Sequence, residues 1–146
     1  MSRLPLPLRR AVQERARGLC EYCHAQMDVT GHEFPVDHIL PKMLGGTDEI
    51  DNLCCSCSGC NTYKQARVQA TDPRTRRVVP LFHPRRDAWD DHFRWSPTAT
   101  RLIGRTAIGR ATIEALRLNR PRLIRSRRIW AEYGLHPPQR RPLQGG

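Results

Sequence analysis

Four residues that suit metal-assisted chemistry on phosphate esters lie close together in the sequence: Asp37, His38, Asn52 and Asn61. Hydrolysis of a phosphodiester needs a base that deprotonates water and a divalent cation that stabilises the pentacovalent phosphate. An imidazole can act as the base, and carboxylate and carboxamide oxygens are ligands that Mg²⁺ and Mn²⁺ prefer. We therefore expect His38 to be the base and Asp37 to hold the cation.

Four cysteines have the spacing of a structural zinc site. Cys20 and Cys23 form one CxxC pair, and Cys57 and Cys60 form a second. Two such pairs can supply four thiolates to one tetrahedral zinc ion. We expect this zinc to tie the N-terminal region to the segment that follows Asp37.

An alternative zinc pairing stays open at this stage. Cys54 and Cys57 also have CxxC spacing, which would leave Cys60 free. Cys54 and Cys55 are more simply interpreted as small buried residues of a strand. A redox role for one CxxC pair fits neither the basic charge of the chain nor the paired spacing.

The elements that must position these residues follow from local patterns. Apolar spacing predicts a helix over residues 8–19, and glycine and proline predict a loop over 24–35. Two strands are predicted over 34–39 and 53–56. A second helix, with a serine available as its N-cap, is predicted over 58–70. Strand, loop, strand and helix together make one compact ββα unit.

Beyond residue 70 the residues suited to chemistry become sparse. Short strands are predicted over residues 78–82 and 101–104, and helices over 107–119 and 121–134. Residues 90–96 contain two aromatic side chains and a histidine, which favours a packed core over a second metal site. Residues 136–146 are rich in Pro, Arg and Gly, and we expect them to be disordered.

Composition points to a polyanionic partner. The 146 residues contain 25 Lys and Arg against 14 Asp and Glu, a net charge of +11. Most of the excess lies after residue 100, and the arginines of residues 107–128 are expected to contact DNA rather than only solvent. No apolar run is long enough for a membrane span, and no secretory signal is recognisable. We therefore expect a cytoplasmic protein that does not bind membranes.

The motifs, taken in order, resemble the HNH endonuclease family, the His-Me finger nucleases with a ββα-metal fold. The resemblance rests on the first CxxC pair, Asp37-His38 with Pro41, Gly45-Gly46, Asn52-Leu53, the second CxxC pair, Asn61 and Lys64. It implies metal-dependent cleavage of DNA by a one-metal mechanism that leaves 5′-phosphate and 3′-hydroxyl ends.

The resemblance also assigns roles to single residues. His38 resembles the general base, Asp37 a metal ligand, and Asn52 the middle asparagine that braces the loop and orients the base. Asn61 occupies the place of the last histidine of the family, so the chain resembles the HNN variant, with Asp37 and Asn61 as ligands of a catalytic Mg²⁺ or Mn²⁺. Lys64 lies three residues later on the helix, where its ammonium could meet a phosphate.

The sequence thus predicts an α+β protein in which a small ββα-metal core, stapled by a four-cysteine zinc site, carries a basic helical C-terminal extension. Residues 8–70 are the expected nuclease core, 71–135 the extension packed on it, and 136–146 the tail. The expected DNA contacts are Lys64, Arg67, Arg117, Arg120, Arg125 and Arg128. The alternative function is a zinc-containing module that binds DNA or RNA without cutting it, and RNA is also open as a substrate.

Overall fold

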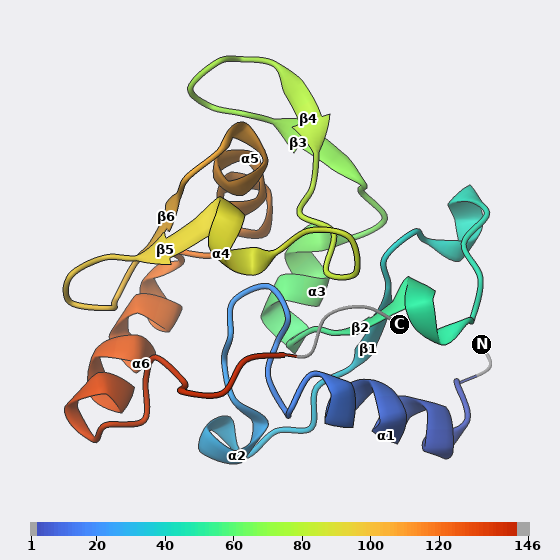
Figure 1. Ribbon diagram of the computed structural model, residues 1–146, viewed down its shortest axis with the longest axis horizontal. Helices are drawn as coiled ribbons and strands as arrows, with labels where there is room; N and C mark the ends of the chain where they lie inside the picture. The colour runs from blue at the N-terminus through green and yellow to red at the C-terminus, as the bar shows by residue number, and fades with distance from the viewer. Residues whose placement is uncertain (1–2, 143–146) are drawn as a thin grey trace.

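Helices and short strands alternate along residues 3–142, the part of the chain that the computed structural model describes (Figure 1). The elements are, in order, α1 (Leu6–Arg15), α2 (Met27–Thr30), β1 (Val36–His38), the 3₁₀ helices η1 (Lys42–Leu44) and η2 (Ile50–Asn52), β2 (Leu53–Cys55), α3 (Ser58–Lys64), β3 (Gln69–Thr71), β4 (Val78–Pro80), α4 (Trp89–His92), β5 (Phe93–Trp95), β6 (Leu102–Gly104), α5 (Ala107–Leu116) and α6 (Pro121–Glu132). The strands form three antiparallel pairs, β1–β2, β3–β4 and β5–β6. The predicted α+β class is confirmed.

The unit that positions the candidate site consists of β1, β2 and α3. β1 and β2 pair in a register that places Asp37 opposite Cys54. β2 is buried over its whole length, which fixes this register because a slip of one residue would turn its side chains to the other face. α3 follows at once, with Cys57 as its N-cap. The structure therefore contains the predicted order of strand, loop, strand and helix.

α3 is shorter than predicted. We expected it to continue to about residue 70, but it ends at Lys64 because Gln65 adopts a left-handed backbone conformation with φ of 55°. The guanidinium of Arg67 then donates to the backbone oxygens of Tyr63 (2.6 Å) and Lys64 (3.3 Å). The Lys64 oxygen also accepts from the backbone N–H of Arg67 at 3.2 Å, so Arg67 caps the carbonyl end of the helix. Residues 69–71, expected to be helical, form β3 instead.

α1 delivers the chain to the first cysteine pair. It contains Pro7 in its first turn, where a missing N–H costs nothing. Val12 and Ala16 are completely buried, and α1 packs on β1 and β2. The backbone turns left-handed at Gly18, with φ of 72°, so the helix ends before residue 19. The predicted helix exists, shifted toward the N-terminus, and Cys20 follows its end.

The C-terminal elements share a core with the ββα unit. One cluster of buried apolar side chains includes Val12 of α1, Tyr22, Phe82, Leu116 of α5 and Leu123 of α6. α5 contacts α3, and Figure 1 shows α5 (brown) and α6 (orange) on one side of α3 with α1 (blue) on the other. The aromatic segment that we interpreted as core forms β5, which pairs with β6.

The chain from residue 136 to residue 142 differs from our expectation. His136 is 6% exposed, packs edge-on against the ring of Trp95, and places Nε2 2.8 Å from the carbonyl oxygen of Ala99. Arg141 lies 3.1 Å from Nδ1 of His24. Where the composition predicted disorder, the structure thus gives His136 and Arg141 packing and hydrogen-bond contacts with distant segments. Residues 143–146 of the expected tail lie outside the described residues.

Between residues 3 and 142, no helix combines the length and the apolar character that crossing a membrane requires.

Candidate active site and zinc centre

Asp37 on β1 forms an ion pair with Lys64 at the end of α3. The Lys64 Nζ lies 2.9 Å from Asp37 Oδ2, and the two side chains are 2% and 15% exposed. Burial raises the pKa of Asp37, and the adjacent ammonium of Lys64 opposes this shift. Lys64 also donates to the backbone oxygens of His38 (3.2 Å) and Ile39 (3.5 Å). We expected this ammonium to be accessible to a phosphate; the structure instead buries it against β1.

His38 is bound to a residue that the sequence analysis did not single out. Its Nε2 lies 2.7 Å from Asp48 Oδ1, and the second oxygen of Asp48 is 3.1 Å from the Nζ of Lys42. The His38 side chain is 23% exposed and that of Asp48 is 47% exposed. The contact with His38, followed by that with Lys42, lowers the pKa of Asp48. Asp48 was part of a predicted polar loop, and only the fold brings it to His38.

Asn52 braces the loop that carries Asp48. Its side-chain oxygen accepts from the backbone N–H of Leu40 (2.9 Å), and its nitrogen donates to the backbone oxygens of Leu40 (3.0 Å) and Thr47 (2.9 Å). A Cβ at Gly46 would lie 1.7 Å from the oxygen of Leu40, so this loop requires glycine there. Asn52 therefore joins the backbone at Leu40 to the backbone at Thr47.

Asn61 lies on α3, one turn before Lys64, and its side chain is half-buried. Residues three apart share one helix face, and Lys64 contacts Asp37, so this face of α3 is turned toward β1. The carboxamide of Asn61 makes no hydrogen bond to any of residues 3–142. Lys64 pairs with Oδ2 of Asp37. Carboxylate and carboxamide oxygens are the ligands that a hard divalent cation such as Mg²⁺ or Mn²⁺ prefers.

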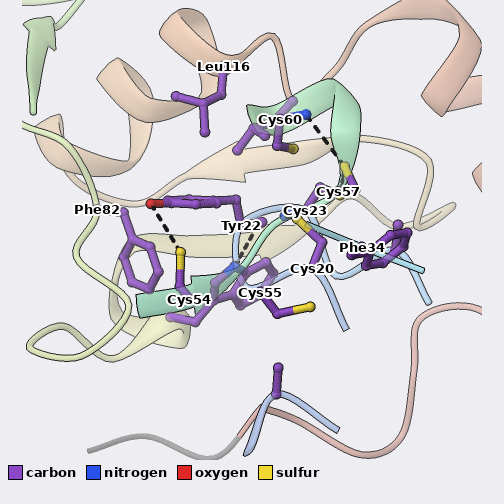
Figure 2. Packing of buried hydrophobic residues seen from close by; sticks show 14 of the residues in the cluster. Cys20, Tyr22, Cys23, Phe34, Cys54, Cys55, Cys57, Cys60, Phe82 and Leu116 are labelled. Atoms are coloured by element: carbon purple, nitrogen blue, oxygen red, sulfur yellow. Dashed lines mark hydrogen bonds between the residues drawn. The ribbon is translucent and has the colours of Figure 1, made fainter. Parts of the chain in front are cut away.

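Four cysteines meet at the start of α3, as the spacing predicted. The sulfur atoms of Cys20, Cys23, Cys57 and Cys60 all lie within 4.8 Å of one another, and all four residues are buried (Figure 2). The sulfurs of Cys23 and Cys57 are 3.7 Å apart. Zn–S bonds of about 2.3 Å in a tetrahedron separate neighbouring sulfurs by about 3.8 Å. The donor set and its spacing therefore fit zinc.

Backbone hydrogen bonds complete the two turns of this centre. The N–H of Cys23 points to the sulfur of Cys20, and the N–H of Cys60 points to that of Cys57, each at 3.5 Å. Hydrogen bonds from the neighbouring thiols hold the pKa of Cys57 far below its ordinary value, whereas burial raises the pKa of Cys20. A bound cation would allow all four sulfurs to be thiolates.

The alternative ligand pair is not supported by the structure. Cys54 and Cys55 lie on β2, apart from the four-cysteine cluster (Figure 2). The thiol of Cys54 donates to the hydroxyl oxygen of Tyr22 at 3.8 Å. The backbone N–H of Cys55 donates to the carboxylate of Glu21 at 2.8 Å. Both thiols are buried parts of the core, as we interpreted them.

Arg120, one of the expected DNA contacts, lies against the four-cysteine cluster. Its guanidinium nitrogens are 3.7 Å from the sulfur of Cys57 and 3.8 Å from that of Cys60. A Cβ at Gly59 would lie 2.5 Å from the same guanidinium, so the close approach depends on glycine. Burial acts to lower the pKa of Arg120, but the neighbouring cysteine sulfurs together outweigh it and raise this pKa above its ordinary value. Arg120 therefore fastens the start of α6 to the centre.

The other expected DNA contacts fall into two groups. Arg67 donates to the backbone oxygen of Ala115 at 2.9 Å in addition to capping α3, and Arg117 lies over the ring of Tyr63 with 5.0 Å to its centroid. Arg125 and Arg128 are exposed on α6. Of the expected DNA contacts, only Arg125 and Arg128 expose their charge to solvent with no hydrogen-bond, ion-pair or aromatic partner for the guanidinium among residues 3–142.

A groove of about 940 Å³ runs between α3, the start of α6 and residues 25–34. Its lining includes the cations Arg120 and Arg122, the aromatic side chains of Tyr63 and Trp130, and no carboxylate. Because Arg120 is held against the cysteine sulfurs, the exposed cation of this groove is Arg122. Asp37, His38 and Asn61 do not line the groove.

Part of the chain, the segment that contains the candidate site, matches a known protein family. Residues 20–75, less than half of the chain, match the family model described as HNH endonuclease. The matched segment contains the four clustered cysteines, both strands of the ββα unit and the whole of α3. The family resemblance that the motifs indicated is confirmed for this segment. No curated protein and no solved structure matches the chain.

Proposed function

We propose that this protein is a metal-dependent endonuclease that hydrolyses DNA phosphodiester bonds. The observation that carries the proposal is that Lys64, one helical turn after Asn61 on α3, contacts the carboxylate of Asp37 and the backbone oxygen of His38 on β1, within the segment that matches the nuclease family. The basic groove and the net charge of +11 support a nucleic acid as substrate.

In this proposal His38 is the general base that removes a proton from the attacking water, and Asp37 and Asn61 hold one Mg²⁺ or Mn²⁺ ion. That cation would stabilise the charge on the pentacovalent phosphate and on the leaving 3′ oxygen. Attack of water on phosphorus with loss of the 3′ oxygen leaves 5′-phosphate and 3′-hydroxyl ends. Lys64 keeps Asp37 ionised and in place, and Asn52 keeps the loop beside His38 in its conformation.

Zinc has a separate, structural role in this proposal. Four thiolates close a tetrahedral site and leave no position for water or substrate. The ion would connect the turn after α1 to the start of α3, the helix that carries Asn61.

The proposal is tested by incubating the purified protein with supercoiled plasmid DNA and either Mg²⁺ or Mn²⁺. We expect nicked or linear product whose 5′ ends accept label from a kinase only after phosphatase treatment. His38→Ala should abolish cleavage while it retains DNA binding in EDTA. Cleavage that persists in His38→Ala would remove the assigned base. A parallel reaction on RNA decides the substrate class.

The second candidate function is a zinc-containing module that binds DNA or RNA without cutting it. The exposed arginines of α6 and the four-cysteine centre would serve such a module equally well. Tight binding without metal-dependent cleavage of either nucleic acid, by protein with full zinc content, would establish this alternative.

A further inference from the structure

We propose that Asp48 is the positioning residue for His38: its carboxylate accepts a hydrogen bond from Nε2–H and thereby leaves the unprotonated Nδ1 available to the attacking water. This inference rests on the proposed nuclease function, and neither the sequence motifs nor the family match assigns a role to Asp48.

The direction of the hydrogen bond fixes the state of the imidazole ring. An ionised carboxylate can only accept hydrogen bonds, so at the 2.7 Å contact the donor must be His38 Nε2. In a neutral imidazole one nitrogen carries the proton and the other has a free lone pair. With Nε2 as the donor, the basic lone pair is on Nδ1. Asp48 thus selects the tautomer in which Nδ1 can act as a base.

Asp48 is itself positioned by two contacts, one to its carboxylate and one to the backbone of the residue before it. Lys42 binds its other oxygen at 3.1 Å. The backbone of Thr47, the preceding residue, is bound by the side chain of Asn52 at 2.9 Å. A chain of contacts therefore leads from Asn52 through Thr47 and Asp48 to His38. These contacts explain how Asn52, which does not itself touch the imidazole, could have the orienting role expected of it.

The backbone of His38 is fixed independently of its ring. Lys64 donates to the His38 carbonyl oxygen at 3.2 Å, and β1 pairs with the buried strand β2. With the backbone held from one side and Nε2 from the other, rotation about the side-chain bonds is restricted. A general base must be held within hydrogen-bond reach of the proton that it removes.

The first experiment measures the tautomer of His38 without DNA or a catalytic metal. Long-range ¹H–¹⁵N correlation spectra of the zinc-loaded protein, with the His38 signals identified from His38→Gln, distinguish a protonated Nε2 from a protonated Nδ1. For the neutral ring we expect the Nε2–H form to dominate, and Asp48→Ala to make it a mixture. Glu49→Ala, which removes the neighbouring exposed carboxylate, is the matched control and should leave the spectrum unchanged. A dominant Nδ1–H form, or a spectrum that Asp48→Ala does not alter, would overturn the inference.

The second experiment measures kcat and KM for DNA cleavage. Loss of orientation should lower kcat by about 100-fold in Asp48→Ala, at the lower end of what a general base contributes, with KM for DNA unchanged. Asp48→Asn should retain part of kcat because a carboxamide oxygen still accepts from Nε2–H. A raised KM with unchanged kcat would make Asp48 a binding residue and contradict the proposal.

Failure of this inference is distinguishable from failure of the proposed function. If the wild-type protein cleaves no nucleic acid, the nuclease proposal fails, while the spectra still report whether Asp48 holds the ring. If the protein cleaves DNA and Asp48→Ala retains full kcat, the nuclease proposal stands and the role of Asp48 is refuted. Zinc content and backbone amide spectra show whether each variant is folded.

Discussion

The cation nearest to the candidate metal ligand is a buried structural partner of that ligand. Lys64 contacts Asp37 and two backbone oxygens of β1 and is 2% exposed. An ion pair taken out of water is costly to form, but removal of one partner is costlier because an uncompensated charge stays buried. Lys64 therefore contributes to the shape and the electrostatics of the site before any substrate arrives.

Lys64→Met should consequently lower the free energy of unfolding by about 3 kcal/mol, the lower end of the range for a broken buried pair. The double variant Asp37→Asn with Lys64→Met should recover part of this loss because it removes the unpaired charge as well. Urea unfolding of the zinc-loaded proteins measures both. If Lys64→Met were as stable as the wild type but bound DNA more weakly, Lys64 would be a phosphate contact, as the sequence suggested.

At the scale of secondary-structure elements, side chains from distant segments hold the extension on the ββα unit. Arg120 at the start of α6 touches two sulfurs of the four-cysteine cluster, and Arg110 of α5 makes a two-pronged contact with Asp72, at the end of β3, at 2.9 and 3.0 Å. Each contact joins a helix of the extension to a residue of the segment that matches the family.

Arg120→Ala should weaken zinc binding by about 10-fold, as is typical when a partner of metal ligands is lost. The guanidinium offsets the negative charge of four thiolates, so its removal should favour release of the ion. Competition with a chromogenic zinc chelator measures the affinity. Arg122→Ala, two residues away at the edge of the groove, is the matched control. Equal zinc affinity in the two variants would show that the contact with sulfur has no energetic role.

The contact between Arg110 and Asp72 predicts a pH dependence. The hydrogen bonds from Arg110 lower the pKa of Asp72 below its ordinary value, so the folded state binds this proton less readily than the unfolded state. The stabilisation is therefore present above the unfolded pKa of about 4 and is lost as the pH falls below it.

Asp72→Asn should accordingly be less stable than the wild type near neutral pH, and the difference should shrink as the pH falls below about 4. Urea unfolding of both proteins across this range measures the difference. Acid release of zinc affects both proteins, so the comparison isolates Asp72. A difference that is constant with pH would contradict the assignment.

The sequence was sufficient for the elements and ligands that depend on local order. The two cysteine pairs and the ββα succession follow from spacing within one segment, and the bracing position expected of Asn52 came from the family resemblance. The contacts made by Asp48, Lys64 and Arg120 could not be predicted, because each depends on how a loop or helix folds back on another element. The end of α3 at Gln65 was missed for a related reason, since no glycine or proline marks it.

On the scale of the whole molecule, the positive charge is divided between structural and exposed arginines. Arg127 is completely buried, donates to the backbone oxygens of Thr100 (3.1 Å) and Leu118 (2.7 Å), and lies over the ring of Trp95. Its neighbour Arg128 is exposed on the same helix. The net charge of the chain therefore overstates the charge that a nucleic acid would meet.

Arg125→Ala and Arg128→Ala should each reduce the slope of log affinity for DNA against log salt concentration by about 1, as expected for the loss of one phosphate contact. Arg127→Met should leave that slope unchanged and lower the unfolding temperature instead, because buried carbonyl oxygens lose their donors. Fluorescence anisotropy in EDTA at several salt concentrations measures the slopes. Unchanged slopes in both exposed-site variants would place the DNA elsewhere on the surface.

Cys57 has two functions in the fold, since it is the N-cap of α3 and also a member of the four-cysteine cluster. The first turn of the helix that carries Asn61 thus shares an atom with the proposed zinc centre. An oxidant that converts this sulfur to a disulfide or a sulfenic acid should expel the ion and unwind that turn together. Loss of zinc, or oxidation of Cys57, would then abolish the proposed DNA cleavage without any dedicated inhibitor.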